Sequence, residues 1–143
     1  GGGDLNFNRL IPGTIRSVLR DEAPVIRSDG KFIRDYFYVR DAVDAYLTLA
    51  ERLPDEEFNG QAFNFSTETP VSVLELVDEI LKLTGKTHLV PKIMNEASRE
   101  IQKQFLSCAK AKSRLGWQSK YSLEEGLKEA IAWYQKVLEI SVS

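Results

Sequence analysis

Apolar positions recur every three or four residues in several stretches of the chain, which is the period of an amphipathic α-helix. The first stretch predicts a helix over residues 8–21, where Pro12 falls in the first turn that tolerates proline. The next helix begins at Asp41, an expected N-cap, and runs to about residue 53. It carries an apolar stripe, which in a globular protein faces the core: Val43, Tyr46, Leu47, Ala50 and Leu53.

Two later helices are marked by capping boxes, the S-x-x-E pattern in which a serine and a glutamate satisfy free amides at a helix start. Ser72 and Glu75 precede one of them, and Gly85 is placed to end it. Ser122 and Glu125 precede the last helix of the chain. Their apolar stripes are Val73, Val77, Ile80 and Leu81 in the first, and Leu127, Ile131, Tyr134 and Leu138 in the second.

Shorter segments indicate strands between these helices. Extended or alternating segments at residues 24–27, 33–39 and 62–66 are typical of strands, and 88–92 and 104–107 are further candidates. Turns or loops separate them at 28–31 and 55–60, and a short helix over 109–115 is closed by Gly116. The pattern therefore predicts a mixed α/β fold, and 143 residues are the size of one domain.

Composition excludes several functional classes. The net charge of −2, with basic residues spread along the chain, argues against a nucleic-acid-binding domain. One cysteine and one histidine cannot build an ordinary zinc site, and no apolar run is long enough to cross a membrane. We therefore expect no metal, no nucleic-acid partner and no membrane partner.

The segment KFIRDYFYVRDAVDAY is the most informative stretch. Arg34 lies beside a glycine turn and shortly before a helix start, a setting that suits a phosphate group. The alternative is a surface arginine paired with Asp35 or Asp41, which composition alone favours. The opening glycines match no dinucleotide loop, because Asn6 stands where G-x-G-x-x-G needs its last glycine and no strand precedes them.

Several motifs together resemble one family. GGGDLN, PGTIRSVLR, RDYFYV, NEASREIQKQ and LSCAKAKSRLGW are similar to the C-terminal half of extended short-chain dehydrogenase/reductases, the NAD-dependent epimerase/dehydratase family. Within that family the chain is most like the CDP-glucose 4,6-dehydratases. The resemblance implies that residues 1–143 form the C-terminal nucleotide-sugar-binding domain of a longer protein. It also implies that Gly1–Gly3 are native sequence rather than a purification scar.

The resemblance implies that the chemistry is divided between two halves. The family carries its NAD loop and its Y-x-x-x-K catalytic pair in the half that precedes this chain. We therefore expect no catalytic residue and no cofactor-binding residue here, and we expect the isolated chain to be inactive.

The resemblance also implies which residues hold the substrate. Arg34 matches the arginine that grips the diphosphate, and Arg9 and Arg27 match positions that face the same ligand. Arg99 and Glu100 fall in a further ligand-binding segment, although EASRE replaces the D-R-x-G-H pattern of related dehydratases. The predicted site residues are thus Arg9, Arg27, Arg34, Arg99 and Glu100.

Three functions stay open at this point. The first is the substrate-binding part of an NAD-dependent lyase that converts CDP-glucose to CDP-4-keto-6-deoxyglucose. The second is part of a nucleotide-sugar 4-epimerase, and the third is a non-catalytic binding module. The resemblance further implies a cytoplasmic enzyme of deoxysugar and carbohydrate biosynthesis whose parent protein is a homo-oligomer.

Overall fold

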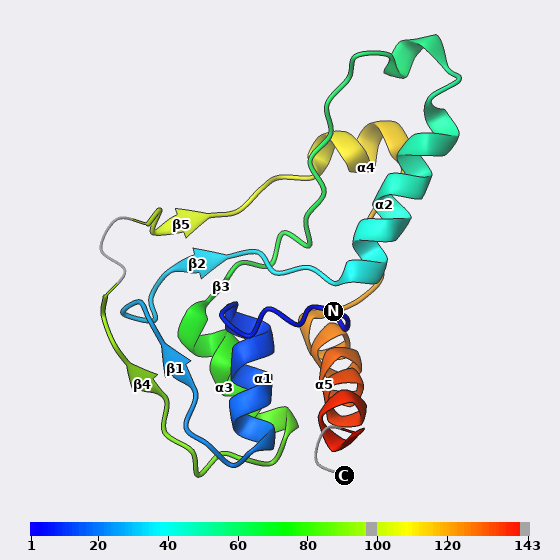
Figure 1. The fold of residues 1–143 in the computed structure, drawn as a ribbon. Helices are drawn as coiled ribbons and strands as arrows, with labels where there is room; N and C mark the ends of the chain where they lie inside the picture. Colours follow the sequence, from blue (N-terminus) through cyan, green and yellow to red (C-terminus); the bar gives the residue numbers. More distant parts are fainter. Residues whose placement is uncertain (97–99, 141–143) are drawn as a thin grey trace.

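Three helices form the body of the molecule. The structure, a computed structural model, describes residues 1–96 and 100–140. In Figure 1, α1 (Leu10–Leu19), α3 (Val73–Leu83) and α5 (Leu123–Ile140) lie together in the lower part of the molecule. Predicted helices are thus confirmed at all three places. Their facing side chains form the main core: Ile15, Leu76, Ile80, Leu127, Ala130, Ile131 and Tyr134.

Local sequence signals explain where these helices begin. The Ser72 hydroxyl accepts a hydrogen bond from the Glu75 amide (3.2 Å), and the Glu75 carboxylate accepts one from the Ser72 amide (2.6 Å). Ser122 and Glu125 make the same reciprocal pair before α5. Both capping boxes are therefore confirmed. The predicted short helix is α4 (Ala109–Leu115), which ends where Gly116 takes a left-handed φ of 67°.

Two small sheets lie beside the body. β1 (Val25–Ile26) pairs in parallel with β4 (Lys92–Ile93). In the second sheet, β2 (Ile33–Arg34) is the central strand, antiparallel to β3 (Val71–Ser72) and parallel to β5 (Lys103–Gln104). The mixed α/β class is confirmed, although each strand is only two residues long. The ladders are shorter than the predicted strands at 24–27, 33–39, 88–92 and 104–107, and β5 begins one residue earlier than expected.

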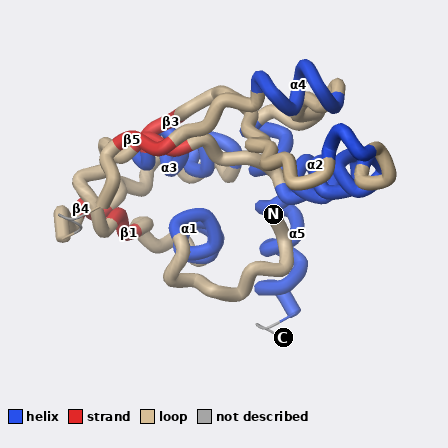
Figure 2. Tube along the Cα trace, turned by 90° about the horizontal axis from the view of Figure 1, so that it is seen from above, coloured by secondary structure: helices blue, strands red, loops and turns tan. Residues whose placement is uncertain are grey.

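A second group of elements extends away from the body, as Figures 1 and 2 show. It contains α2 (Val39–Arg52), the short 3-10 helix η1 (Glu56–Phe58), the segment 62–66 and α4. We call this group the arm. It has a small core of its own: Ala45, Phe58, Cys108, Ala111, Leu115 and Trp117.

The prediction that Asp41 caps α2 is wrong. The helix begins at Val39, its N-cap is Tyr38, and no side chain caps it. Asp41 lies in the first turn and is fully buried. Its carboxylate accepts hydrogen bonds from the backbone amides of Lys120 (2.9 Å) and Tyr121 (3.3 Å). Asp41 therefore ties α2 to the segment before α5 instead of capping its own helix.

The expected burial of α2 is also wrong. The predicted apolar stripe faces outward, and the exposed fractions are 53% for Val43, 78% for Tyr46 and 59% for Leu47. The segment 62–66, predicted as a strand, joins no ladder among the described residues. The arm thus presents an apolar helix face that nothing in the described chain covers. This face is no membrane span, because no helix among the described residues is long and apolar enough to cross a bilayer.

Matched leucine substitutions test this description of the arm. We expect Leu76→Ala, in the main core, to lower the free energy of unfolding by ~2–5 kcal/mol. Leu47→Ala on the exposed face of α2 should change it by less than ~0.5 kcal/mol, because little burial is lost. Urea unfolding of both variants of this chain measures the difference. Equal losses would show that the α2 face is buried in solution.

Candidate functional site

Several positively charged side chains surround a cleft of about 460 Å³. Four arginines line this cleft, and Glu100 is the one acidic residue among the described residues that do so. The arginines come from separate elements: Arg9 and Arg16 from the start and body of α1, Arg27 from the end of β1, and Arg34 from β2. The cleft therefore suits an anionic ligand with more than one negative charge.

The loop before α1 explains how Arg9 reaches the cleft. The Asp4 carboxylate accepts hydrogen bonds from the Asn6 amide and from the Arg9 guanidinium, both at 3.0 Å. These contacts lower the pKa of Asp4, the Asn6 amide having the largest effect. A Cβ at Gly13 would lie 2.5 Å from the Phe7 carbonyl oxygen, so only glycine lets this loop fold back onto the helix.

Arg34 is held in place by contacts within its own strand region. Its guanidinium donates to the Ile33 carbonyl (2.8 Å) and lies 5.7 Å from the Phe32 ring centroid. Its Nη2 is 3.6 Å from a carboxylate oxygen of Glu100, and the side chain keeps 23% of its surface exposed. Among the described residues neither Asp35 nor Asp41 pairs with it; its acidic partner is Glu100, whose side chain is 60% exposed.

The other predicted arginines differ in how far their charge is already paired. Arg9 forms an ion pair with Asp4, while Arg27 donates to the Asn8 side-chain oxygen at 3.3 Å. Among the described residues, Arg27 has no carboxylate partner. Its charge is thus available to a ligand. Arg99, also predicted here, lies outside the described residues.

Sequence reasoning missed Arg16. Its guanidinium carbon lies 4.6 Å from the Phe7 ring centroid, and the side chain reaches the same cleft. Arg16 lies three residues after Gly13 on the same face of α1, but the helical period alone does not show that this face lines a cleft. Arg16 therefore joins the candidate site.

Aromatic side chains form the apolar part of the cleft. Phe7, Phe32 and Tyr36 line it beside the arginines. Burial raises the pKa of Tyr36, and the nearby Arg34 partly offsets this rise. The Tyr36 hydroxyl consequently stays protonated at neutral pH and can donate a hydrogen bond. Flat apolar surfaces beside cations can hold a ring and a charged group of one ligand together.

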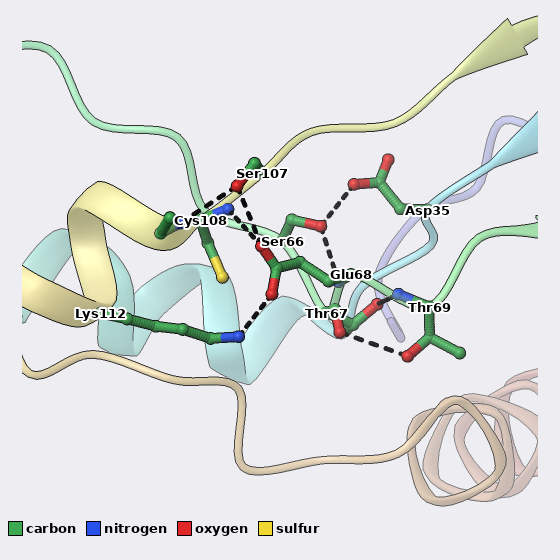
Figure 3. Close-up of polar contacts among 9 residues, drawn as sticks. Asp35, Ser66, Thr67, Glu68, Thr69, Ser107, Cys108 and Lys112 are labelled. Carbon is green, nitrogen blue, oxygen red and sulfur yellow. Dashed lines mark hydrogen bonds and ion pairs between the residues drawn. The ribbon is translucent and has the colours of Figure 1, made fainter.

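The carboxylates of Asp35 and Glu68 hold neighbouring segments together, as Figure 3 shows. One oxygen of Asp35 accepts hydrogen bonds from the Ser66 hydroxyl (2.6 Å) and the Leu106 amide (3.1 Å). Glu68 accepts from the Ser107 hydroxyl (3.1 Å) and the Cys108 amide (2.9 Å). These bonds join the segment 66–68 to the segment 106–108.

Glu68 has a strongly lowered pKa. It pairs with Lys112, and this hydrogen bond, followed by that of the Cys108 amide, lowers its pKa to about 2. The pair also raises the pKa of Lys112. Glu68 adopts a left-handed φ of 54°, a conformation that side chains rarely take. The contacts with Lys112, Ser107 and Cys108 accompany this backbone conformation.

The described residues offer binding chemistry more clearly than reaction chemistry. They contain no group of three His, Cys, Asp or Glu residues that could hold a metal ion. No tyrosine of the chain is followed four residues later by lysine, so the Y-x-x-x-K pair does not occur in the sequence. What the site does offer is a cluster of cations around an aromatic-lined cleft.

Comparison with known proteins finds one matching family and several similar proteins. The family described as GDP-mannose 4,6 dehydratase matches residues 3–130. A UDP-N-acetyl-alpha-D-glucosaminuronate decarboxylase of Bacillus cytotoxicus is 33% identical over 133 residues. That alignment covers 90% of this chain and 40% of the relative.

Two solved structures share the fold. The UDP-glucose 4-epimerase of Thermotoga maritima, solved with UDP-glucose, has a TM-score of 0.80 and 32% identity over 91% of this chain. The dTDP-glucose 4,6-dehydratase of Bacillus anthracis, solved with NAD, has a TM-score of 0.77 and 25% identity over 92% of this chain. The chain spans 40% of each of these proteins, the C-terminal part of their fold.

The lowered pKa of Glu68 predicts that the stability of the fold depends on pH. Because its pKa falls from 4.5 to about 2 on folding, its ionised form stabilises the fold fully above about pH 4.5. That contribution disappears as the pH falls towards 2. Glu68→Gln should therefore be less stable than wild type at pH 6.5, with a smaller difference at pH 3. Urea unfolding at both values tests this, and a difference that does not change with pH would contradict it.

Proposed function

The chain belongs to the GDP-mannose 4,6-dehydratase family, and on that premise we propose that residues 1–143 are the nucleotide-sugar-binding domain of a longer NAD-dependent enzyme. We propose CDP-glucose 4,6-dehydratase as its activity. Support for this subgroup comes from the motifs GGGDLN and NEASREIQKQ, which resemble those dehydratases. The relatives that the chain matches act on sugars attached to nucleotides.

The convergence of four arginines on one cleft carries the proposal. A nucleotide sugar presents a diphosphate between two rings, so it needs cations at the centre and flat surfaces on either side. Arg34 suits the diphosphate, because its planar guanidinium can make two parallel hydrogen bonds to a phosphate. Arg9 and Arg27 flank it, and Arg16 adds a fourth charge on the α1 side. The cleft volume is within the range of small-molecule sites.

Glu100 gains a role from its contact with Arg34. It lies 3.6 Å from the Arg34 guanidinium and balances its charge. A bound diphosphate would replace it there, and the freed carboxylate could accept hydrogen bonds from ligand hydroxyl groups. Arg99, the neighbouring residue, stays part of the proposed site.

The remainder of the protein would supply the cofactor. The chain contains no G-x-G-x-x-G loop, so its residues do not fit an NAD site of that kind. The contribution of this chain is to bind the nucleotide sugar and to orient its sugar ring towards the other half. On this division of labour the isolated chain has no catalytic activity.

A nucleotide-sugar 4-epimerase is the second candidate. The observation in its favour is the 32% identity to the Thermotoga maritima UDP-glucose 4-epimerase. Both enzymes need the same grip on a diphosphate, so the cleft supports either reaction. Product analysis of the full-length protein separates them, because a dehydratase releases water and a 4-keto sugar while an epimerase releases a stereoisomer.

Replacing Arg34 tests the substrate assignment. In the full-length protein, Arg34→Lys should weaken binding of the nucleotide sugar ten- to a hundredfold, since lysine offers a point charge without the fork. This corresponds to a loss of about 1.5–3 kcal/mol, typical of a charge-assisted hydrogen bond. Calorimetric titration with CDP-, UDP- and dTDP-glucose measures the effect and ranks the three nucleotides.

Arg52→Lys is the matched control, because Arg52 lies on α2 and pairs with Asp55 outside the cleft. It should leave affinity unchanged, and both variants should keep the wild-type NAD content. Equal affinities of wild type and Arg34→Lys would remove Arg34 from the site. A preference for UDP- or dTDP-glucose would instead reject the CDP assignment and leave the nucleotide-sugar class standing.

A further inference from the structure

Asp35 follows Arg34 directly, but it does not line the cleft, and its carboxylate contacts Ser66 and Leu106 instead. We propose that Asp35 is a positioning residue: it clamps the two segments that flank β2 and thereby holds Arg34 at the cleft. This inference rests on the proposed function, because it gives Asp35 a role in ligand binding without any contact between Asp35 and the ligand.

The short ladders make such a clamp necessary. β2 pairs with each neighbour over two residues only, at Ile33 and Arg34, so few backbone hydrogen bonds fix its register. Ser66 lies upstream of β3, and Leu106 lies downstream of β5. By accepting hydrogen bonds from both, Asp35 connects the central strand to its two neighbours just beyond the residues where the ladders end.

The partners of Asp35 distinguish this role from an ordinary surface ion pair. Among the described residues it pairs with no lysine or arginine, even though Arg34 is adjacent in sequence. Both of its donors are neutral, and the Ser66 residue is 2% exposed. An ionised acceptor makes hydrogen bonds about twice as strong as a neutral one, so the carboxylate is well suited to holding two segments at once.

The clamp leaves Arg34 little freedom. The guanidinium is already held by the Ile33 carbonyl and lies over the Phe32 ring. A displacement of β2 would move all three residues together and change the distance between Arg34 and the ligand. Loss of Asp35 should therefore weaken ligand binding only by displacing Arg34.

The clamp also connects the cleft to the arm. Ser66 ends the unpaired segment 62–66, and its hydroxyl also accepts a hydrogen bond from the Glu68 amide (2.8 Å). Glu68 in turn contacts the start of α4 through Ser107 and Cys108 (Figure 3). Asp35 is thus one of the residues that join the arm to the segment carrying Arg34.

Variants at Asp35 test the proposal in the full-length protein, with cytidine and uridine diphosphate as calorimetric probes. Asp35→Ala should weaken binding of the better probe about tenfold. Asp35→Asn keeps an oxygen acceptor at the same place and should restore affinity to within about threefold of wild type. Asp78→Ala is the control, since Asp78 lies on α3 and pairs only with Lys82 in the described structure; its affinity should equal that of wild type.

A double variant distinguishes an effect that acts through Arg34 from a general loss of stability. If Asp35 acts through Arg34, then Asp35→Ala combined with Arg34→Lys should bind no more than about twofold weaker than Arg34→Lys alone. Ser66→Ala removes one of the two donors and should cost about threefold, which keeps the test available if Asp35→Ala does not fold.

The possible results separate the two proposals. If wild type binds neither diphosphate, the proposed function fails and the inference fails with it. If wild type binds and the Asp35→Ala or Ser66→Ala variants bind equally well, the clamp is rejected while the function stands. Additive losses in the double variant would show that Asp35 acts independently of Arg34, which also rejects the clamp.

Discussion

The position of β2 is the constraint on which the rest of the site depends. This strand is the centre of a three-stranded sheet, yet each of its ladders is two residues long. Arg34 lines the cleft, whereas the Asp35 carboxylate accepts hydrogen bonds from Ser66 and Leu106. Asp35 is thus occupied by other partners, and the carboxylate that lies near Arg34 is that of Glu100, 3.6 Å away.

The helical period predicted where helices form, but it did not predict which elements pack against their apolar faces. Capping boxes are local, since both partners lie within three residues, and both were found from the sequence. The stripe on α2 is real as a pattern, yet Val43, Tyr46 and Leu47 face outward because no described element packs there. The segment 62–66 alternates like a strand but joins no ladder among the described residues. Alternation shows that a segment can join a sheet, but a ladder also needs a partner strand.

The candidate site, too, could be predicted only in part from the sequence. Resemblance to a family named five residues; Arg99 lies outside the described residues, and the other four, Arg9, Arg27, Arg34 and Glu100, line one cleft. Arg16 and Tyr36 were not named, because the folding of α1 against β1 and β2 brings them there, and a linear pattern does not record such convergence. Asp41 shows a different error, in which a residue was assigned a local role that it does not have. A carboxylate near a helix start was taken for a cap, although its partners lie 79 and 80 residues away in sequence.

A crystal structure of the full-length protein with bound CDP-glucose tests the central claim most directly. The account predicts that the diphosphate lies in the cleft between α1 and β2, within hydrogen-bonding distance of the Arg34 guanidinium, with Glu100 displaced from that guanidinium. It also predicts that Asp35 keeps its bonds to Ser66 and Leu106 in the complex. A diphosphate bound elsewhere, with the Arg34–Glu100 pair intact, would contradict the account.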